Sequence, residues 1–159
     1  MIKVGKIVPV GELRTQLLLL PRPLVMTNGV FDLLHRGHVS YLNAAAKLGQ
    51  ALVVGLNSDV SVRLQGKGPD RPLNPENDRA YVLASLAAVD CVTLFDNLTP
   101  IELVRLIRPD IYVKGGDYEI DKLDEAKLVQ SWGGTACTIP YLKGFSSTAL
   151  INRIRKYES

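Results

Sequence analysis

Cysteine and histidine are scarce in this chain of 159 residues, which has two of each. Cys91 and Cys137 both lie inside apolar segments, as is typical of small buried hydrophobic residues. A disulfide framework or a zinc knuckle is excluded, because each needs more cysteines at closer spacing. The two histidines, His35 and His38, by contrast fall within one short segment.

Long apolar runs and a strong charge of either sign are also absent. The longest leucine run, residues 17–20, ends at Pro21 and is too short to span a bilayer. No signal-peptide pattern opens the chain, so we expect a cytoplasmic protein that does not interact with the membrane. The net charge of +3, without a basic stripe, argues against nucleic acid as a partner but fits an anionic ligand.

What the chain does contain is 47% hydrophobic and 22% charged residues. This composition is typical of a packed globular protein, and the length suits a single domain over residues 1–159. Apolar segments with the character of buried strands alternate with segments of helical periodicity. We expect strands at residues 24–27, 51–56, 91–95, 111–114 and 135–139, and helices at residues 12–20, 39–48, 74–88, 99–107, 123–132 and 147–156.

The alternation predicts an α/β fold, a Rossmann-like doubly wound parallel sheet of about five strands with helices on both faces. Two helix starts have specific signals: Asn74 before Pro75, and a capping box of Thr99 and Glu102. Sheets of this kind bind ligands at the carboxyl ends of their strands, near the point where the strand order reverses. The loops that leave the strands are therefore where we expect the functional site.

The loop after the first strand, TNGVFDLLHRGH at residues 27–38, combines glycines with both histidines. Gly29 lets the backbone turn tightly, and Gly37 leaves the start of the next helix unobstructed. The first amides of a helix lack intrahelical partners and favour an anion. His35 and His38, about one helical turn apart, would project the same way and donate to phosphoryl oxygens. We expect a phosphate site here, with a zinc site completed by carboxylates as the alternative.

The second strand is followed by Asn57, Ser58 and Asp59, of which either of the last two can cap a helix. The segment 64–80 is rich in glycine, proline and basic residues, among them Lys67, Arg71 and Arg79. Such a loop can close over a polyphosphate, although basic loop residues are often only solvated.

Two further loops carry polar residues after strands. In VKGGDY, residues 113–118, Lys114 stands beside two glycines and Asp117 follows them. In GFSST, residues 144–148, three consecutive hydroxyls precede a helix. A helix start with hydroxyl groups is either a simple cap or a second anion site, and the number of hydroxyls favours the second.

The segment GVFDLLHRGH resembles the G-x-F-D-x-x-H-x-G-H signature of the cytidylyltransferase-like nucleotidyltransferase superfamily. Its members join a nucleoside triphosphate to a phosphorylated substrate and release pyrophosphate. Residues 144–148 are similar to the second signature of the superfamily, a glycine and an apolar residue before a Ser/Thr-rich segment. Many members carry an arginine shortly before that glycine, whereas this chain has Lys143 directly beside it.

Over roughly residues 6–155, the chain resembles the members that act on heptose 1-phosphate in lipopolysaccharide core synthesis, in a stand-alone form without the sugar kinase to which many are fused. This resemblance implies transfer of AMP from ATP to a sugar 1-phosphate. It also implies a homodimer, and Mg²⁺ carried by ATP with no metal held by the protein. The alternatives are a cytidylyltransferase for glycerol 3-phosphate, a nucleotide-binding module without turnover, and a metal-dependent hydrolase.

The same resemblance implies roles for individual residues. The expected catalytic residues are His35, His38, Lys67, Ser147 and Thr148. The expected nucleotide-binding residues are Thr27, Asn28, Gly29, Phe31, Asp32, Gly37, Asn57, Arg79, Gly144, Phe145 and Ser146. The expected residues for the phosphorylated acceptor are Asp59, Arg63, Lys114, Gly115 and Asp117.

Overall fold

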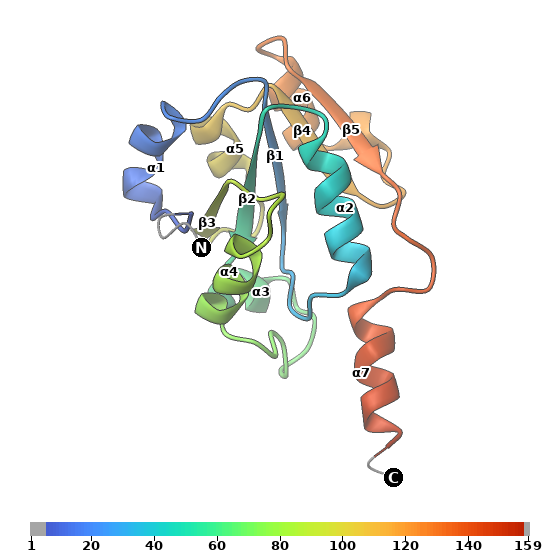
Figure 1. The fold of residues 1–159 in the computed structure, drawn as a ribbon. Helices are drawn as coiled ribbons and strands as arrows, with labels where there is room; N and C mark the ends of the chain where they lie inside the picture. The colour runs from blue at the N-terminus through green and yellow to red at the C-terminus, as the bar shows by residue number, and fades with distance from the viewer. Residues whose placement is uncertain (1–5, 158–159) are drawn as a thin grey trace.

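A parallel sheet forms the centre of the computed structural model, which describes residues 6–157 (Figure 1). The five strands of the sheet lie in the order β3-β2-β1-β4-β5. They are β1 (Leu24–Gly29), β2 (Ala51–Asn57), β3 (Cys91–Phe95), β4 (Ile111–Gly115) and β5 (Thr135–Ile139). The helices are α1 (Val10–Leu17), α2 (Arg36–Ala46), α3 (Asp59–Leu64), α4 (Glu76–Ala84), α5 (Ile101–Ile107), α6 (Asp124–Gln130) and α7 (Ser147–Arg155), with a short 3₁₀ helix η1 (Ile120–Lys122). All the predicted strands are confirmed.

β2 is buried along its whole length, as its uninterrupted apolar sequence ALVVGLN predicts for a strand covered on both faces. β1 pairs with β2 on one side and with β4 on the other. From β1 the chain continues outward to β2 and β3, and then returns to place β4 and β5 on the opposite side. The strand order therefore reverses between β1 and β4, which is where such sheets bind ligands.

Two hydrophobic clusters cover the two faces of this sheet. On one face, α2 and α4 contribute core residues such as Leu42 and Leu83. On the other face, α1, α5 and α6 contribute Leu13, Val104 and Val129. Helices on both faces confirm the predicted doubly wound arrangement.

The two predicted helix starts are wrong in detail. Asn74 does not cap α4, and its side chain instead donates to the main-chain carbonyl of Asp32 at 2.7 Å. In α5, Pro100 occupies the N-cap position without a side-chain cap, so the box of Thr99 and Glu102 does not start this helix. Asn74 is used by the tertiary structure instead, which local sequence signals do not reveal.

α7 differs from the long helices that pack on the sheet, because none of its residues is buried. It extends beyond the body of the molecule at the C-terminal end of the described chain (Figure 1). Within residues 6–157, no helix has both the length and the apolar character that crossing a membrane requires. The fold thus positions one site at the strand ends, with α7 beside it.

Candidate active site

The loop between β1 and α2 brings the two histidines into contact. His35 is the N-cap residue of α2, and its Nδ1 accepts a hydrogen bond from the amide of Gly37 at 3.1 Å. The rings of His35 and His38 stack with their centroids 3.9 Å apart. A Cβ atom on Gly37 would lie 2.9 Å from the His35 ring, so glycine is what allows this ring to fold over the helix start.

Both imidazoles are poised to be neutral donors. Burial, with a smaller contribution from His35, lowers the pKa of His38 to about 4. Burial also lowers the pKa of His35. Because the Nδ1 of His35 accepts a hydrogen bond, its proton resides on Nε2. The Nδ1 of His38 is buried and makes no hydrogen bond within the described residues. A neutral imidazole keeps one N–H, and this is the type of donor that suits a phosphoryl oxygen.

The N-terminus of α7 lies beside that of α2. Ser146 caps α7 through its side chain, and the hydroxyl of Ser147 donates to the carbonyl of Leu33 in the histidine loop at 3.2 Å. His35, His38 and both serines line one cavity of about 320 Å³. The structure thus brings together two predicted phosphate-binding segments that are far apart in the sequence.

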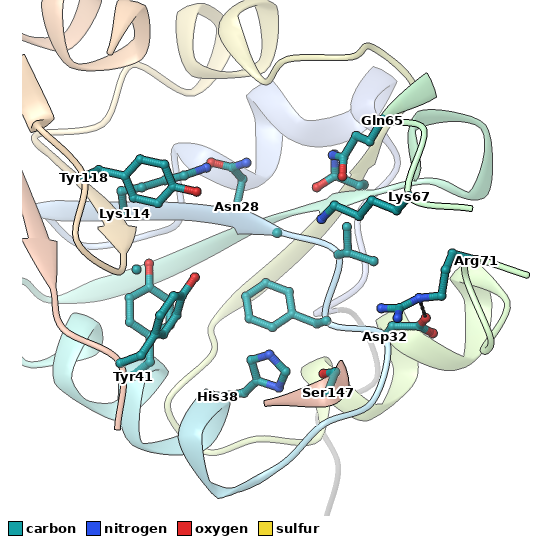
Figure 2. A pocket seen from close by; sticks show the side chains of 16 residues that line it. Asn28, Asp32, His38, Tyr41, Gln65, Lys67, Arg71, Lys114, Tyr118 and Ser147 are labelled. Carbon is teal, nitrogen blue, oxygen red and sulfur yellow. Dashed lines mark ion pairs between the residues drawn. The ribbon is translucent and has the colours of Figure 1, made fainter. Parts of the chain in front are cut away.

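A crevice opens at the carboxyl ends of β1 and β4 and has a volume of about 280 Å³. Figure 2 shows His38 and Ser147 close to each other between two unlike ends of this crevice. What we call the aromatic end contains Tyr41, Lys114, Gly115, Tyr118 and Tyr141. What we call the cationic end contains Gln65, Lys67 and Arg71.

Glycines at the end of β4 shape the aromatic end. A Cβ atom on Gly115 or on Gly116 would lie 2.8 Å from the ring of Tyr141, so only glycine lets that ring rest on this backbone. The Nζ of Lys114 lies 5.5 Å from the centroid of the Tyr118 ring. Burial is the main cause that lowers the pKa of Lys114. This end therefore combines flat aromatic surfaces with a partly buried amine.

The cationic end is formed by the loop between α3 and α4, and Asp32 anchors that loop. The carboxylate of Asp32 accepts hydrogen bonds from the amides of Leu73 and Asn74, each at 2.9 Å. It also pairs with the guanidinium of Arg71 at 2.9 Å (Figure 2). Only 1% of the Asp32 side chain is exposed. Asp32 lines the crevice, but its oxygens are used to hold the loop.

Arg79 does not reach the crevice, which corrects its predicted role in nucleotide binding. Its side chain is fully buried and donates to the carbonyls of Val30, Asn57 and Asn74. It also pairs with Asp59 at 2.7 Å. Because these partners occupy the guanidinium, Arg79 ties the loop after β1 to the loop after β2 instead of binding a phosphate.

The structure spreads the other predicted residues around the site. Those that line the crevice are Asn28, Gly29, Phe31 and Asn57. Gly37 and Phe145 line the histidine cavity, and Thr148 lines a neighbouring one. Thr27 is buried, with its hydroxyl 2.5 Å from that of Tyr41. Residues outside these three spaces are Asp59, Arg63, Asp117 and Gly144.

The sequence-based prediction gave no role to five residues that line the crevice: Val30, Tyr41, Gln65, Tyr118 and Tyr141. A signal for the last two was present, because Tyr118 closes the segment VKGGDY and Tyr141 follows β5 after one residue. Aromatic residues just after two neighbouring strands, with glycines at one strand end, indicate a slot for a flat group. Gln65 carried no such signal.

Metal-binding side chains do not gather at this site. Among residues 6–157, no group of three or more His, Cys, Asp or Glu residues is placed to hold a metal ion. The histidine pair would therefore lack the further ligands that a zinc site needs. Imidazole N–H groups, helix amides and basic side chains instead suit an anion whose charge grows during a reaction.

A parallel sheet with a polar crevice where its strand order reverses is typical of a nucleotide-binding α/β domain. Comparison with known proteins assigns the chain to a family. The chain belongs to the cytidylyltransferase-like family, whose model matches residues 26–153.

The chain is similar to relatives that differ in how much of their own length it covers. It is 60% identical over 137 residues to D-beta-D-heptose 1-phosphate adenylyltransferase of Bordetella bronchiseptica, with 86% of this chain and 85% of that protein covered. It is 55% identical over 131 residues to the bifunctional protein HldE of Magnetococcus marinus, which covers 82% of this chain. The chain spans only 26% of that bifunctional relative.

Solved structures show the same fold. The lipopolysaccharide core biosynthesis protein from Thermoplasma volcanium matches with a TM-score of 0.61 and 35% identity, over 77% of this chain and 98% of that one. Pantothenate synthetase from Thermus thermophilus matches with a TM-score of 0.65 over 96% of this chain and 70% of that one. At 18% identity, the second match shows the fold alone.

Proposed function

We propose that this protein transfers AMP from ATP to a heptose 1-phosphate, which yields ADP-heptose and pyrophosphate. The observation that carries this proposal is the single cavity that His35, His38 and Ser147 line together at the N-termini of α2 and α7. The name of the relative at 60% identity supports the choice of nucleotide and acceptor. An ADP-activated heptose would serve lipopolysaccharide core synthesis.

The reaction suits the groups that the site offers. An oxygen of the sugar phosphate attacks the α-phosphorus of ATP in line, and pyrophosphate leaves. This nucleophile is already anionic, so no general base is required. The task of the protein is to position both substrates and to stabilise charge on the phosphoryl oxygens. His35 and His38 would donate to those oxygens, and the first amides of α2 and α7 would support them.

Mg²⁺ would arrive with ATP, as the resemblance to the family implies. When bound, it would neutralise part of the phosphate charge. The protein's own cations, Lys67 and Arg71, would act on the same charge from the cationic end. The magnesium requirement predicted from the sequence is thus part of this proposal.

The two ends of the crevice suit different parts of the substrates. Adenine is flat and apolar, so the aromatic end with Tyr118 and Tyr141 suits the adenosine. The acceptor carries a phosphate, which suits Lys67 at the cationic end. We therefore move Lys114 and Gly115 from the predicted acceptor site to the nucleotide site.

The test is pyrophosphate release over a matrix of nucleotides and phosphorylated acceptors. We expect ATP with heptose 1-phosphate to give the highest kcat/KM. A maximum with CTP and glycerol 3-phosphate would instead support a cytidylyltransferase of the same fold. ATP binding without release for any acceptor would support a nucleotide-binding module.

Two expectations from the sequence stay predictions. A homodimer is expected only because members of the superfamily commonly form one, and light scattering on the purified protein tests it. A cytoplasmic location likewise stays a prediction, and fractionation of cells tests it.

A further inference from the structure

A chain of hydrogen bonds ends at the crevice, and the roles assigned so far do not use it. It begins at Asn57, the last residue of β2, whose Nδ2 donates to the hydroxyl of Ser61 at 2.9 Å. The hydroxyl of Ser61 donates in turn to the main-chain carbonyl of Asn97 at 2.6 Å. Only 2% of Asn57 and none of Ser61 is exposed. These three groups form what we call the Asn57 relay.

The Asn57 relay determines which end of the Asn57 amide faces a substrate. A main-chain carbonyl can only accept, so the one proton of the Ser61 hydroxyl is used by Asn97. The oxygen of Ser61 must then accept from Nδ2 of Asn57, which leaves Oδ1 for the crevice that Asn57 lines. This Oδ1 receives no hydrogen bond from residues 6–157, and it is not closed off from solvent as the Nδ1 of His38 is. Asn57 therefore offers the crevice an acceptor.

The amide of Asn28, on the neighbouring strand β1, has the opposite orientation. Its Oδ1 accepts from the hydroxyl of Tyr112 at 2.6 Å, so its Nδ2 is the group left for the crevice (Figure 2). Burial raises the pKa of Tyr112, so this phenol keeps its proton and remains a donor. A donor such as Nδ2 of Asn28 suits a phosphate, which when ionised has only acceptors. The Oδ1 of Asn57 instead requires a partner with a proton to donate, such as a hydroxyl.

The position of Asn57 indicates which substrate carries that hydroxyl. β2 and β4 flank β1 on opposite sides, so Asn57 lies away from Lys114 and the aromatic end. α3 begins two residues after Asn57 and leads to Gln65 and Lys67 of the cationic end. The carboxylate of Asp32 at that end already accepts from the loop that it holds. Asn57 thus provides an acceptor of fixed direction beside the end where the phosphorylated sugar is proposed to bind.

We propose that Asn57 is a specificity-determining residue that accepts a hydrogen bond from a hydroxyl of the phosphorylated sugar, and that Ser61 is a positioning residue that holds the amide in the required orientation. The proposal rests on the proposed adenylyl transfer and adds a contact to the acceptor substrate. It replaces the role in nucleotide binding that the sequence suggested for Asn57. The ribose of ATP also carries hydroxyls, so the experiment compares both substrates.

The test measures pyrophosphate release by the full-length protein with a series of heptose 1-phosphates that each lack one hydroxyl. In the wild type, one of these deoxy analogues should lose about five- to a hundredfold in kcat/KM, because it leaves the Oδ1 of Asn57 without a partner. In Asn57→Ala, heptose 1-phosphate itself should lose a similar factor, and that analogue should lose no more. The wild type and Asn57→Ala should use 2′-deoxy-ATP and 3′-deoxy-ATP with the same efficiency relative to ATP.

Ser61→Ala tests the positioning role, with Ser58→Ala as the matched control. Ser58 is also buried, but its hydroxyl caps α3 by accepting from the amide of Ser61 at 3.1 Å and is not part of the Asn57 relay. Without the hydroxyl of Ser61, the Asn57 amide can rotate. The KM for heptose 1-phosphate should then rise, and the preference for it over the deoxy analogue should shrink by about two- to tenfold, with the KM for ATP unchanged. Ser58→Ala should keep the wild-type preference even where urea denaturation shows a loss of stability.

Because Ser61→Ala keeps Asn57 in place, it tests the proposal even if Asn57→Ala does not fold. Three results would overturn the assignment of Asn57: a wild type that uses every deoxy analogue as well as heptose 1-phosphate, Asn57→Ala with the wild-type preference, or a loss confined to the deoxy forms of ATP. The last result would assign Asn57 to the ribose. Equal changes in Ser58→Ala and Ser61→Ala would refute the positioning role. Failure of the proposed function is a separate outcome, seen as wild-type protein that releases no pyrophosphate with intact heptose 1-phosphate.

Discussion

α2 and α7 present their N-termini to the same cavity, but the protein holds them in different ways. α2 buries Gly37, Tyr41, Leu42 and Ala45 against the sheet. α7 buries none of its residues, and the hydroxyl of Ser147 provides a hydrogen bond between its first turn and the histidine loop. One half of the phosphate site is thus built into the core, and the other half is attached at its edge. An enzyme that must release pyrophosphate benefits from a half that can move.

A buried polar network extends the rigid half beyond the helix. Arg79 joins the loops that follow β1 and β2, and Asp32 fixes the loop that carries Lys67 and Arg71. Both side chains are almost completely buried. Groups of this kind are costly when one partner is lost, because the others remain buried without compensation. Substitutions in this network should therefore lower the free energy of unfolding more than substitutions in α7.

Replacement of Arg79 by alanine should have the largest effect on stability. Asp59 would lose its ion-pair partner and three carbonyls would lose their donor, which we expect to cost about 3–5 kcal/mol in free energy of unfolding. Urea denaturation measures this cost. Arg63→Ala, on the exposed side of α3, is the control and should change stability by less than about 0.5 kcal/mol. Equal effects of the two substitutions would contradict the role of Arg79.

The histidine half should dominate catalysis, and the α7 half should contribute less per side chain. His38→Ala removes a donor to the reacting phosphate and should lower kcat by about 10²–10³ with the fold intact. Ser147→Ala removes one hydrogen bond to Leu33 but leaves the amides of α7, so kcat should fall by no more than about tenfold. The rate of pyrophosphate release at saturating substrate concentrations gives kcat for both variants. A folded His38→Ala protein with normal turnover would refute the assignment of His38.

The strands and the position of the histidine loop beside residues 144–148 could be predicted from the sequence, whereas the buried network around Arg79 could not. Apolar segments and helical periodicity located the strands, and the rule that ligands bind at the carboxyl ends of parallel strands placed the histidine loop near residues 144–148. Gly37 could be interpreted because its lack of a side chain has a local consequence at a helix start. Predictions succeeded where a local pattern or a general rule for parallel sheets determines the geometry.

Arg79 shows why the rest could not be predicted. The sequence shows a basic residue near a glycine-rich loop, which favours a phosphate contact, but it does not show that three carbonyls and Asp59 converge on it. The position of Tyr141 over Gly115 likewise depends on how two strand ends are aligned. Such contacts join residues that are distant in the sequence, so a local pattern can mark Tyr141 as a candidate but does not show which backbone its ring contacts.

The smallest effect is expected on α7, where Ile154 is 53% exposed. Ile154→Ala should change the free energy of unfolding by less than about 0.5 kcal/mol, because little apolar surface leaves water there. Leu42→Ala, in the buried face of α2, should cost about 2–5 kcal/mol in the same denaturation experiment. A large loss at Ile154 that grows with protein concentration would mean that a second copy of the chain covers α7. In that case α7 would be exposed only in the isolated chain, and association of two chains would bury it as α2 is buried.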